Sequence, residues 1–225
     1  MKAKLLLACG VLSSLLYVFM NAFVAMQWPG YSTVSQTVSE LSAIGAPTRT
    51  LWVALGVVYS LLVLLFAWGI WTSAAGHRRL RVVGALMLAY AITGLAWPFA
   101  PMHLRGTPST LSDAMHIALA VVTSVLMVAA MGVGATALGK RFAVYSVLTI
   151  VVLLAFGTLT SLEAPGIAAN RPTPWIGLWE RIDIGVFLLW MVVLTVALWR
   201  RLPAAGTPEI SRRGPRAWAL RRGAL

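Results

Sequence analysis

The stretch LWVALGVVYSLLVLLFAWGIWT, residues 51–72, runs for 22 positions without one charged side chain. A helix rises about 1.5 Å per residue, so about 20 apolar residues are enough to cross the hydrocarbon core of a bilayer. The run is too long for a strand of a transmembrane barrel, which alternates over about ten residues. It therefore predicts a membrane-spanning helix.

The composition of the whole chain agrees with this prediction. Of the 225 residues 60% are apolar and 11% are charged, and the mean hydropathy is +0.85. A soluble domain has about a quarter of its residues charged. We therefore predict an all-α, polytopic membrane bundle over residues 1–199, followed by a basic tail over residues 200–225. The six predicted spans are Leu5–Met26, Leu51–Thr72, Val82–Ala100, Ala114–Leu138, Ala143–Leu162 and Ile184–Trp199.

The distribution of lysine and arginine predicts the orientation. If the chain begins inside and crosses six times, 14 of the 18 basic residues fall on the cytoplasmic side. The four on the outer side are Arg49, Arg105, Arg171 and Arg181. This positive-inside bias places both termini in the cytoplasm. The net charge of +12 is then a signal for topology and for the lipid surface, and it requires no nucleic acid.

The two ends of the chain each allow two interpretations. Residues 1–26 begin like a signal peptide, but the apolar run is long and lacks a clear cleavage site, so we expect a retained anchor. The single cysteine, Cys9, excludes an intramolecular disulfide. The tail from residue 200 either contacts anionic lipid headgroups or is solvated and serves only to enforce topology.

The predicted topology concentrates chemically useful side chains on the outer side. Five of the six acidic residues map there, together with two of the three histidines. We therefore expect any functional site to face outward. The acidic residues and histidines that map to the outer side are Glu40, Asp113, Glu163, Glu180, Asp183, His103 and His116.

The first outer loop, residues 28–47, predicts a short interfacial helix. Thr33 and Gln36 have the spacing of a capping box, and Gly45 with Pro47 would end the helix. Its serines either satisfy backbone groups or form a polar wall over a pocket. Glu40 would then point inward, or pair with an arginine of another outer segment. The serines that share a helical face are Ser32, Ser35, Ser39 and Ser42, and the arginines considered are Arg181 and Arg49.

The second outer loop carries a candidate metal site. Asp113 and His116 are three positions apart at the start of the fourth span, so they share a helical face. If the loop folds back, His103 would complete a set able to hold a divalent metal. Asp113 is equally well explained as the third residue of a cap opened by Thr110.

The third outer segment brings charges to the membrane boundary. Glu180, Arg181 and Asp183 directly precede the sixth predicted span. They would form either an interfacial collar of ion pairs or part of an outer pocket. Within the predicted spans the polar residues are uncharged, which argues against charge translocation through the bundle.

The first loop also resembles a known family. The pattern Tyr31-Ser-x-x-Ser-x-x-x-Ser-Glu-Leu-Ser-Ala-x-Gly-Ala-Pro47 is similar to the signature of a bacterial six-helix membrane family, domain of unknown function 998. Prolines after the third span, His116 and the pair Glu180-Arg181 are similar too. The resemblance implies a six-helix bundle in a bacterial plasma membrane with an outer-face site, and it names no reaction. The chain departs from the expected pattern at Met102-His103, where we would expect an acid.

Three functions from different classes follow. The first is a pocket that binds a membrane lipid or small amphipathic molecule, lined by Ser35, Ser39, Glu40, His116, Glu180 and Arg181. The second is a metal-dependent lipid hydrolase, with His103, Asp113 and His116 on the metal and Glu40, Asp113 or Glu180 as catalytic candidates. The third is a structural or assembly partner of another membrane protein. The sequence leaves the oligomeric state open.

Overall fold

The computed structural model describes residues 2–202 of the chain, so most of the predicted tail lies outside the described residues. Within this range six helices are long and apolar enough to cross a membrane, which confirms the predicted all-α multi-pass bundle. They are α1 (Lys2–Met26), α2 (Arg49–Ser73), α3 (Arg78–Ala96), α4 (Leu111–Ala135), α5 (Lys140–Glu163) and α7 (Ile176–Trp199).

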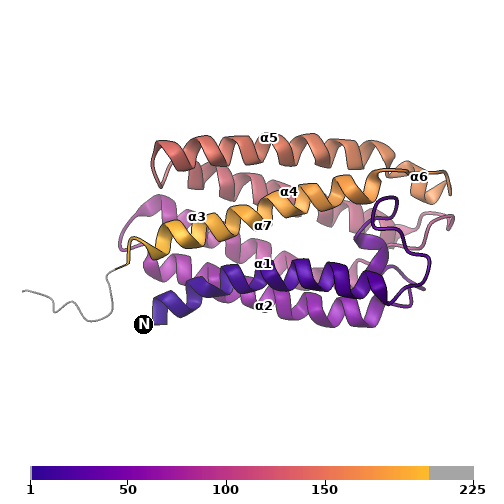
Figure 1. Ribbon diagram of the computed structural model, residues 1–225, viewed down its shortest axis with the longest axis horizontal. Helices are drawn as coiled ribbons and strands as arrows, with labels where there is room; N and C mark the ends of the chain where they lie inside the picture. The colour runs from indigo at the N-terminus through magenta and orange to yellow at the C-terminus, as the bar shows by residue number, and fades with distance from the viewer. Residues whose placement is uncertain (1, 203–225) are drawn as a thin grey trace, which may run out of the picture.

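The six long helices form a ring of neighbours (Figure 1). Each packs against the next in chain order, from α1 to α5 and on to α7, and α7 packs back against α1. Short connections and the start of α1 lie at one end of the ring. The other end, called here the long-loop end, carries residues 27–48, 97–110 and 164–175. Three short helices lie there: η1 (Ser39–Ser42), η2 (Trp97–Phe99) and α6 (Pro165–Ala168).

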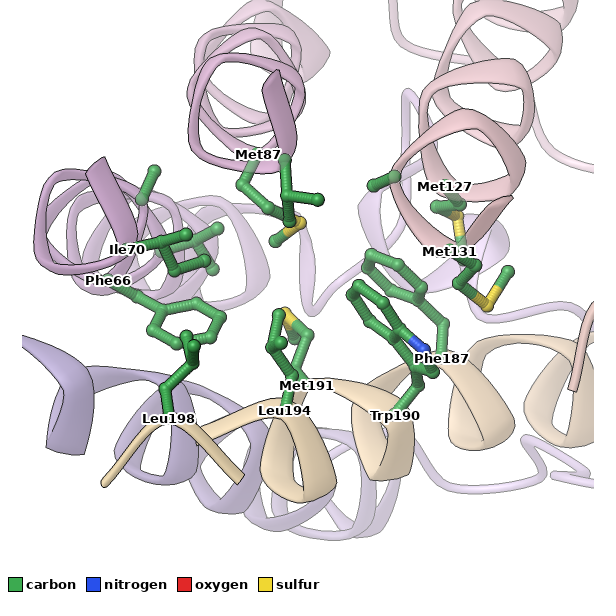
Figure 2. Close-up of a cluster of buried hydrophobic side chains, with 14 of the residues drawn as sticks. Phe66, Ile70, Met87, Met127, Met131, Phe187, Trp190, Met191, Leu194 and Leu198 are labelled. Carbon is green, nitrogen blue, oxygen red and sulfur yellow. The ribbon is translucent and has the colours of Figure 1, made fainter. Parts of the chain in front are cut away.

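The interior of the ring is filled by large side chains toward the end at which α1 begins. Phe66, Met87 and Met191 point toward one another from three helices, and Met131 of a fourth helix lies near Phe187 and Trp190 (Figure 2). The indole of Trp190 donates to Ser146 Oγ at 2.9 Å, so its one polar atom is satisfied. Lipid tails are as apolar as these side chains, so dispersion contacts stabilise this core more than the hydrophobic effect does.

Two local predictions about helix starts need correction. The helix of the first loop is a single 3-10 turn that begins at Ser39, because Gln36 Oε1 accepts from the Ser32 amide at 2.9 Å instead of completing a cap with Thr33. The last long helix begins at Ile176, eight residues earlier than the hydropathy predicts. Asp183 therefore lies in the second turn of a membrane helix, about 10 Å along its axis.

Candidate functional site

A cavity of about 210 Å³ lies inside the ring, and helices α1, α2, α3, α4 and α7 contribute to its wall together with η1 and η2. Most of the lining is apolar, with a few polar groups that converge from different helices. This combination is typical of ligand sites between the helices of a bundle. The polar and aromatic lining residues include Tyr17, Ser39, Arg49, Trp52, Tyr59, Tyr90, Trp97, His116, Glu180 and Asp183.

Tyrosines form one part of the wall. The hydroxyl oxygens of Tyr59 on α2 and Tyr90 on α3 lie 2.9 Å apart, so one donates to the other. Tyr17 of α1 meets Tyr59 edge to face, with ring centroids 5.0 Å apart. Trp52 also meets Tyr17 edge to face, with ring centroids 5.8 Å apart. These contacts place a continuous aromatic surface beside the cavity.

Glu180 lies where the first loop meets α7. One of its carboxylate oxygens accepts from the Val38 amide, and the other accepts from Ser39 Oγ at 3.1 Å. Both partners flank the start of η1, and Val38, Ser39 and Glu180 all line the cavity. Glu180 therefore holds the first loop against the end of the cavity with both of its carboxylate oxygens.

Asp183 has a different environment from Glu180, although the two are three residues apart on α7. Its Oδ1 atom is buried and has no hydrogen-bond partner among the described residues. Gly157 of α5 lies behind it, and a methyl group added there would stand 3.6 Å from Oδ1. Asp183 is therefore a carboxyl group on the cavity wall that residues 2–202 leave without a cation.

His116 reaches the cavity from α4. Its Nδ1 lies 2.8 Å from the carbonyl oxygen of Ala100. A carbonyl can only accept, so Nδ1 carries the proton and Nε2 is the nitrogen left for other contacts. The ring packs edge to face on Trp97, with centroids 4.8 Å apart. The imidazole is thus held in one orientation on the cavity wall.

Arg181 lies outside this cavity and ties the first loop to the bundle. Its Nε donates to Asn21 Oδ1 at 3.0 Å, and its Nη1 donates to the carbonyl oxygens of Thr33 at 2.7 Å and Gln36 at 3.0 Å. Its Nη2 donates to the hydroxyl of Tyr31 at 2.7 Å. Burial raises the pKa of Tyr31 to about 12, so the phenol stays neutral and can itself donate to the backbone.

The first loop packs against the start of α7 at very short range. The amides of Gly177 and Leu178 both donate to the Val34 carbonyl, at 2.9 and 3.1 Å. These amides belong to the first turn of the helix, where N–H groups have no hydrogen-bond acceptor within the helix itself. A methyl group on Gly177 would overlap the Gln36 carbonyl oxygen, so the close approach requires glycine here.

Glu40 pairs with Arg105, and the predicted alternatives Arg181 and Arg49 are wrong as its partners. Arg105 Nε and Nη2 donate to the two carboxylate oxygens at 2.8 and 2.9 Å. Glu40 is fully buried, and its hydrogen bond raises the pKa of Arg105. Arg181 is occupied by the first-loop carbonyls described above. Arg49 is occupied by the Ser42 carbonyl at 2.7 Å.

Thr173 connects this ion pair to the third long connection. Its hydroxyl donates to the Ser35 carbonyl at 3.0 Å, and Arg105 Nη2 donates to that same carbonyl at 3.2 Å. The Arg105 guanidinium also lies 3.4 Å from Thr173 Oγ1. Residues of all three long connections thus meet around the ion pair of Glu40 and Arg105.

Asp113 confirms the capping interpretation. Its Oδ2 accepts from the Thr110 amide at 2.8 Å, and Thr110 caps the start of α4 in return. The same carboxylate accepts from the His103 amide at 2.8 Å and faces His103 Nδ1 at 2.9 Å. Across residues 2–202 no group of three or more His, Cys, Asp or Glu side chains has the geometry for a metal ion. Metal binding at His103, Asp113 and His116 stays a prediction.

The structure brings together only part of the predicted site. Ser39, His116 and Glu180 line the cavity, whereas the lining does not include Ser35, Glu40 or Arg181. Arg49 and Asp183 do line it and were not predicted as ligand contacts. Tyr59, Tyr90 and Ser124 also lie on the wall, and their one sequence signal is a polar group inside an apolar span.

Comparison with known proteins identifies a family and no function. A family model described as "Protein of unknown function (DUF998)" matches residues 11–197, which is most of the chain. No curated protein and no solved structure matches the chain.

Proposed function

The chain belongs to the DUF998 family of unknown function, and we propose that this member binds the polar head of a lipid or small amphipathic molecule in the cavity inside the ring. The observation that carries the proposal is the cavity itself, an apolar space of about 210 Å³ at which Ser39, His116, Glu180 and Asp183 converge. A membrane protein is surrounded by lipids, which are amphiphilic, so an amphiphilic molecule is the ligand most readily available to this cavity.

The size of the cavity limits how much of a ligand can enter it. The cavity has a volume of about 210 Å³. Sites for complete drug-sized ligands have about 300–1,000 Å³. We therefore propose that the cavity receives the head group of an amphiphile and that the chain of the molecule extends elsewhere.

We further propose that the cavity faces the outside of a bacterial plasma membrane and that both termini are cytoplasmic. The support is the distribution of basic residues, of which 14 of 18 lie in segments at the opposite end of the bundle or in the tail. The predicted contact of the tail with anionic headgroups belongs to the same proposal. In this orientation the ligand would come from the outer leaflet or from beyond it.

Two observations favour binding over the alternatives. A hydrolase would need His103, Asp113 and His116 on one metal, but His103 and Asp113 are paired with each other. A purely structural role would need every polar group of the long-loop end to be paired. Glu40 fits that expectation, whereas Asp183 on the cavity wall does not.

The experiment compares lipids that co-purify with three proteins. Gly56 of α2 lines the cavity, and a Cβ atom there would meet open space, so Gly56→Leu fills the cavity without a clash at Cβ. Gly132 of α4 is exposed, has equally open space and is absent from the lining, so Gly132→Leu is the matched control.

Each protein is purified in mild detergent and examined by mass spectrometry. We expect wild type and Gly132→Leu to retain the same amphiphile and Gly56→Leu to lose it, at equal unfolding temperatures. An amphiphile retained equally by all three proteins, or by none of them, would overturn the proposal.

A further inference from the structure

We propose that the head group received by the cavity is a cation, either a primary amine or a quaternary ammonium, and that Asp183 is its counter-charge. This inference rests on the proposed function, because it names the ligand class of the same cavity. It is carried by three observations: an unpaired carboxyl group, the commitment of nearby arginines elsewhere, and the aromatic wall.

The carboxyl groups of Glu180 and Asp183 both line the cavity, but they differ in their hydrogen bonds to the protein. Glu180, one turn away, has a hydrogen-bond donor on each oxygen. Asp183 has no such donor within residues 2–202, and its Oδ1 is buried. A buried carboxylate without a partner is costly, so such a group pairs with a cation or binds a proton.

The nearby arginines do not serve as that partner. Arg181 uses Nε, Nη1 and Nη2 on the first loop, Asn21 and Tyr31. Arg49 lines the cavity, and its Nη1 is bound to the Ser42 carbonyl at 2.7 Å. Neither arginine forms an ion pair with Asp183 in the described chain.

Aromatic rings supply the second half of a site for a cation. Tyr17, Trp52, Tyr59, Tyr90 and Trp97 all line the cavity. The faces of such rings attract ammonium groups, and the attraction strengthens when water is excluded. A cavity whose lining combines a carboxyl group with several aromatic rings has the two features that bind an ammonium ion.

The charges of the wall disfavour the opposite choice. Two carboxyl groups, Glu180 and Asp183, line the cavity beside one guanidinium, that of Arg49. An anionic head group would meet more like charges than opposite ones. A zwitterion that places its ammonium at Asp183 and its anionic group near Arg49 belongs to the proposed class.

Binding of two probes with the same chain length tests the charge. The protein is reconstituted into nanodiscs of digalactosyldiacylglycerol, an uncharged lipid whose head group contains no amine, and tritiated dodecylamine or dodecanol is titrated onto it. Gly56→Leu serves as the blank that removes partitioning into the lipid. Asp183→Asn removes the charge, and Asp183→Glu keeps it. Glu163→Gln is the matched control, because Glu163 has a buried unpartnered oxygen but does not line the cavity.

We expect wild type and Glu163→Gln to bind dodecylamine saturably and more tightly than dodecanol. Asp183→Asn should weaken amine binding about tenfold or more, as the loss of a buried charge-assisted contact implies. Asp183→Glu should recover part of the affinity. If Asp183→Asn does not fold, the comparison of the two probes on wild type still tests the charge.

The two proposals fail in different ways. If dodecylamine and dodecanol bind equally, or if folded Asp183→Asn binds the amine as wild type does, the proposal of a cationic head group is overturned. The proposed binding cavity still holds in that case, provided that Gly56→Leu abolishes the binding. If neither probe shows binding sensitive to Gly56→Leu, the proposed function fails, and the cation fails with it.

Discussion

Arg105 donates two hydrogen bonds, of 2.8 and 2.9 Å, to the carboxylate of Glu40, which lies 65 positions earlier in the chain. The carboxylate is fully buried and also accepts from the Thr37 amide at 2.8 Å. This pair joins the first long connection to the second, and Thr173 adds the third. The geometry of the long-loop end, which includes the η1 residues at the cavity, therefore depends in part on this charged contact.

Removal of Arg105 should strongly destabilise the protein. Arg105→Ala leaves Glu40 buried without its cation, and loss of one partner of a buried pair costs about 3–5 kcal/mol. Arg105→Lys should cost less, since it keeps the charge but cannot form the two-pronged contact. Thermal unfolding followed by tryptophan fluorescence measures both. The control is Arg171→Ala, at an exposed position of the same end. Equal unfolding temperatures for Arg105→Ala and this control would contradict the prediction.

Gly177→Ala should displace the first loop. The added methyl group would overlap the Gln36 carbonyl oxygen and lie 2.7 Å from that of Thr33, and both are backbone atoms that cannot rotate away. We expect a loss of at least about 1–3 kcal/mol in the free energy of unfolding. Gly185→Ala on the same helix meets open space, so it should be neutral or stabilising by up to about 1 kcal/mol. If both variants unfold at the same temperature, the close packing of the loop on α7 is wrong.

The hydroxyl pair of Tyr59 and Tyr90 should show energetic coupling. Either single change to Phe leaves one buried hydroxyl without a partner, which costs about 1–3 kcal/mol. The double change removes both groups, so it should cost less than the sum of the single changes. A double-mutant cycle of unfolding free energies measures this difference. Strict additivity would mean that the two hydroxyls do not interact.

The proposed orientation predicts which positions a membrane-impermeant maleimide can label in intact cells. In a Cys9→Ser background, Arg171→Cys at the long-loop end should be labelled from outside. His77→Cys, between α2 and α3 at the other end, should be labelled only after lysis. Both positions are exposed. The reverse pattern would invert the topology and place the cavity on the cytoplasmic side.

Metal content separates binding from metal-dependent hydrolysis. His103 and Asp113 face each other at 2.9 Å, and no group of three His, Cys, Asp or Glu side chains within residues 2–202 could hold a metal ion, so we expect less than stoichiometric metal in protein purified without chelators. Inductively coupled plasma mass spectrometry of wild type beside His116→Ala measures it. One zinc or manganese per chain that is lost in His116→Ala would favour the hydrolase.

Local sequence alone was enough to predict several features of this protein. The lengths of the apolar segments predicted the six helices, because a segment in lipid must hydrogen-bond its own backbone groups and a helix does so within itself. The cap of Thr110 and Asp113 was equally predictable, because both residues belong to one helical turn. The family signature in residues 31–47 rests on sequence alone as well, and the match over residues 11–197 confirms it.

Only the tertiary structure decided the partners of the charged residues. Residues 180–183 reduce local hydropathy, so the last span was predicted to start at Ile184; yet α7 begins at Ile176, and the first loop binds Glu180 and Arg181. From the sequence, several arginines were possible partners of Glu40, and only the packing of the ring places Arg105 beside it. The cavity arises from that same closure, since its wall joins residues of five helices whose side chains leave an unfilled space. Spacing along a chain determines contacts within one helical turn, whereas contacts across about 65 or more residues depend on how the helices pack.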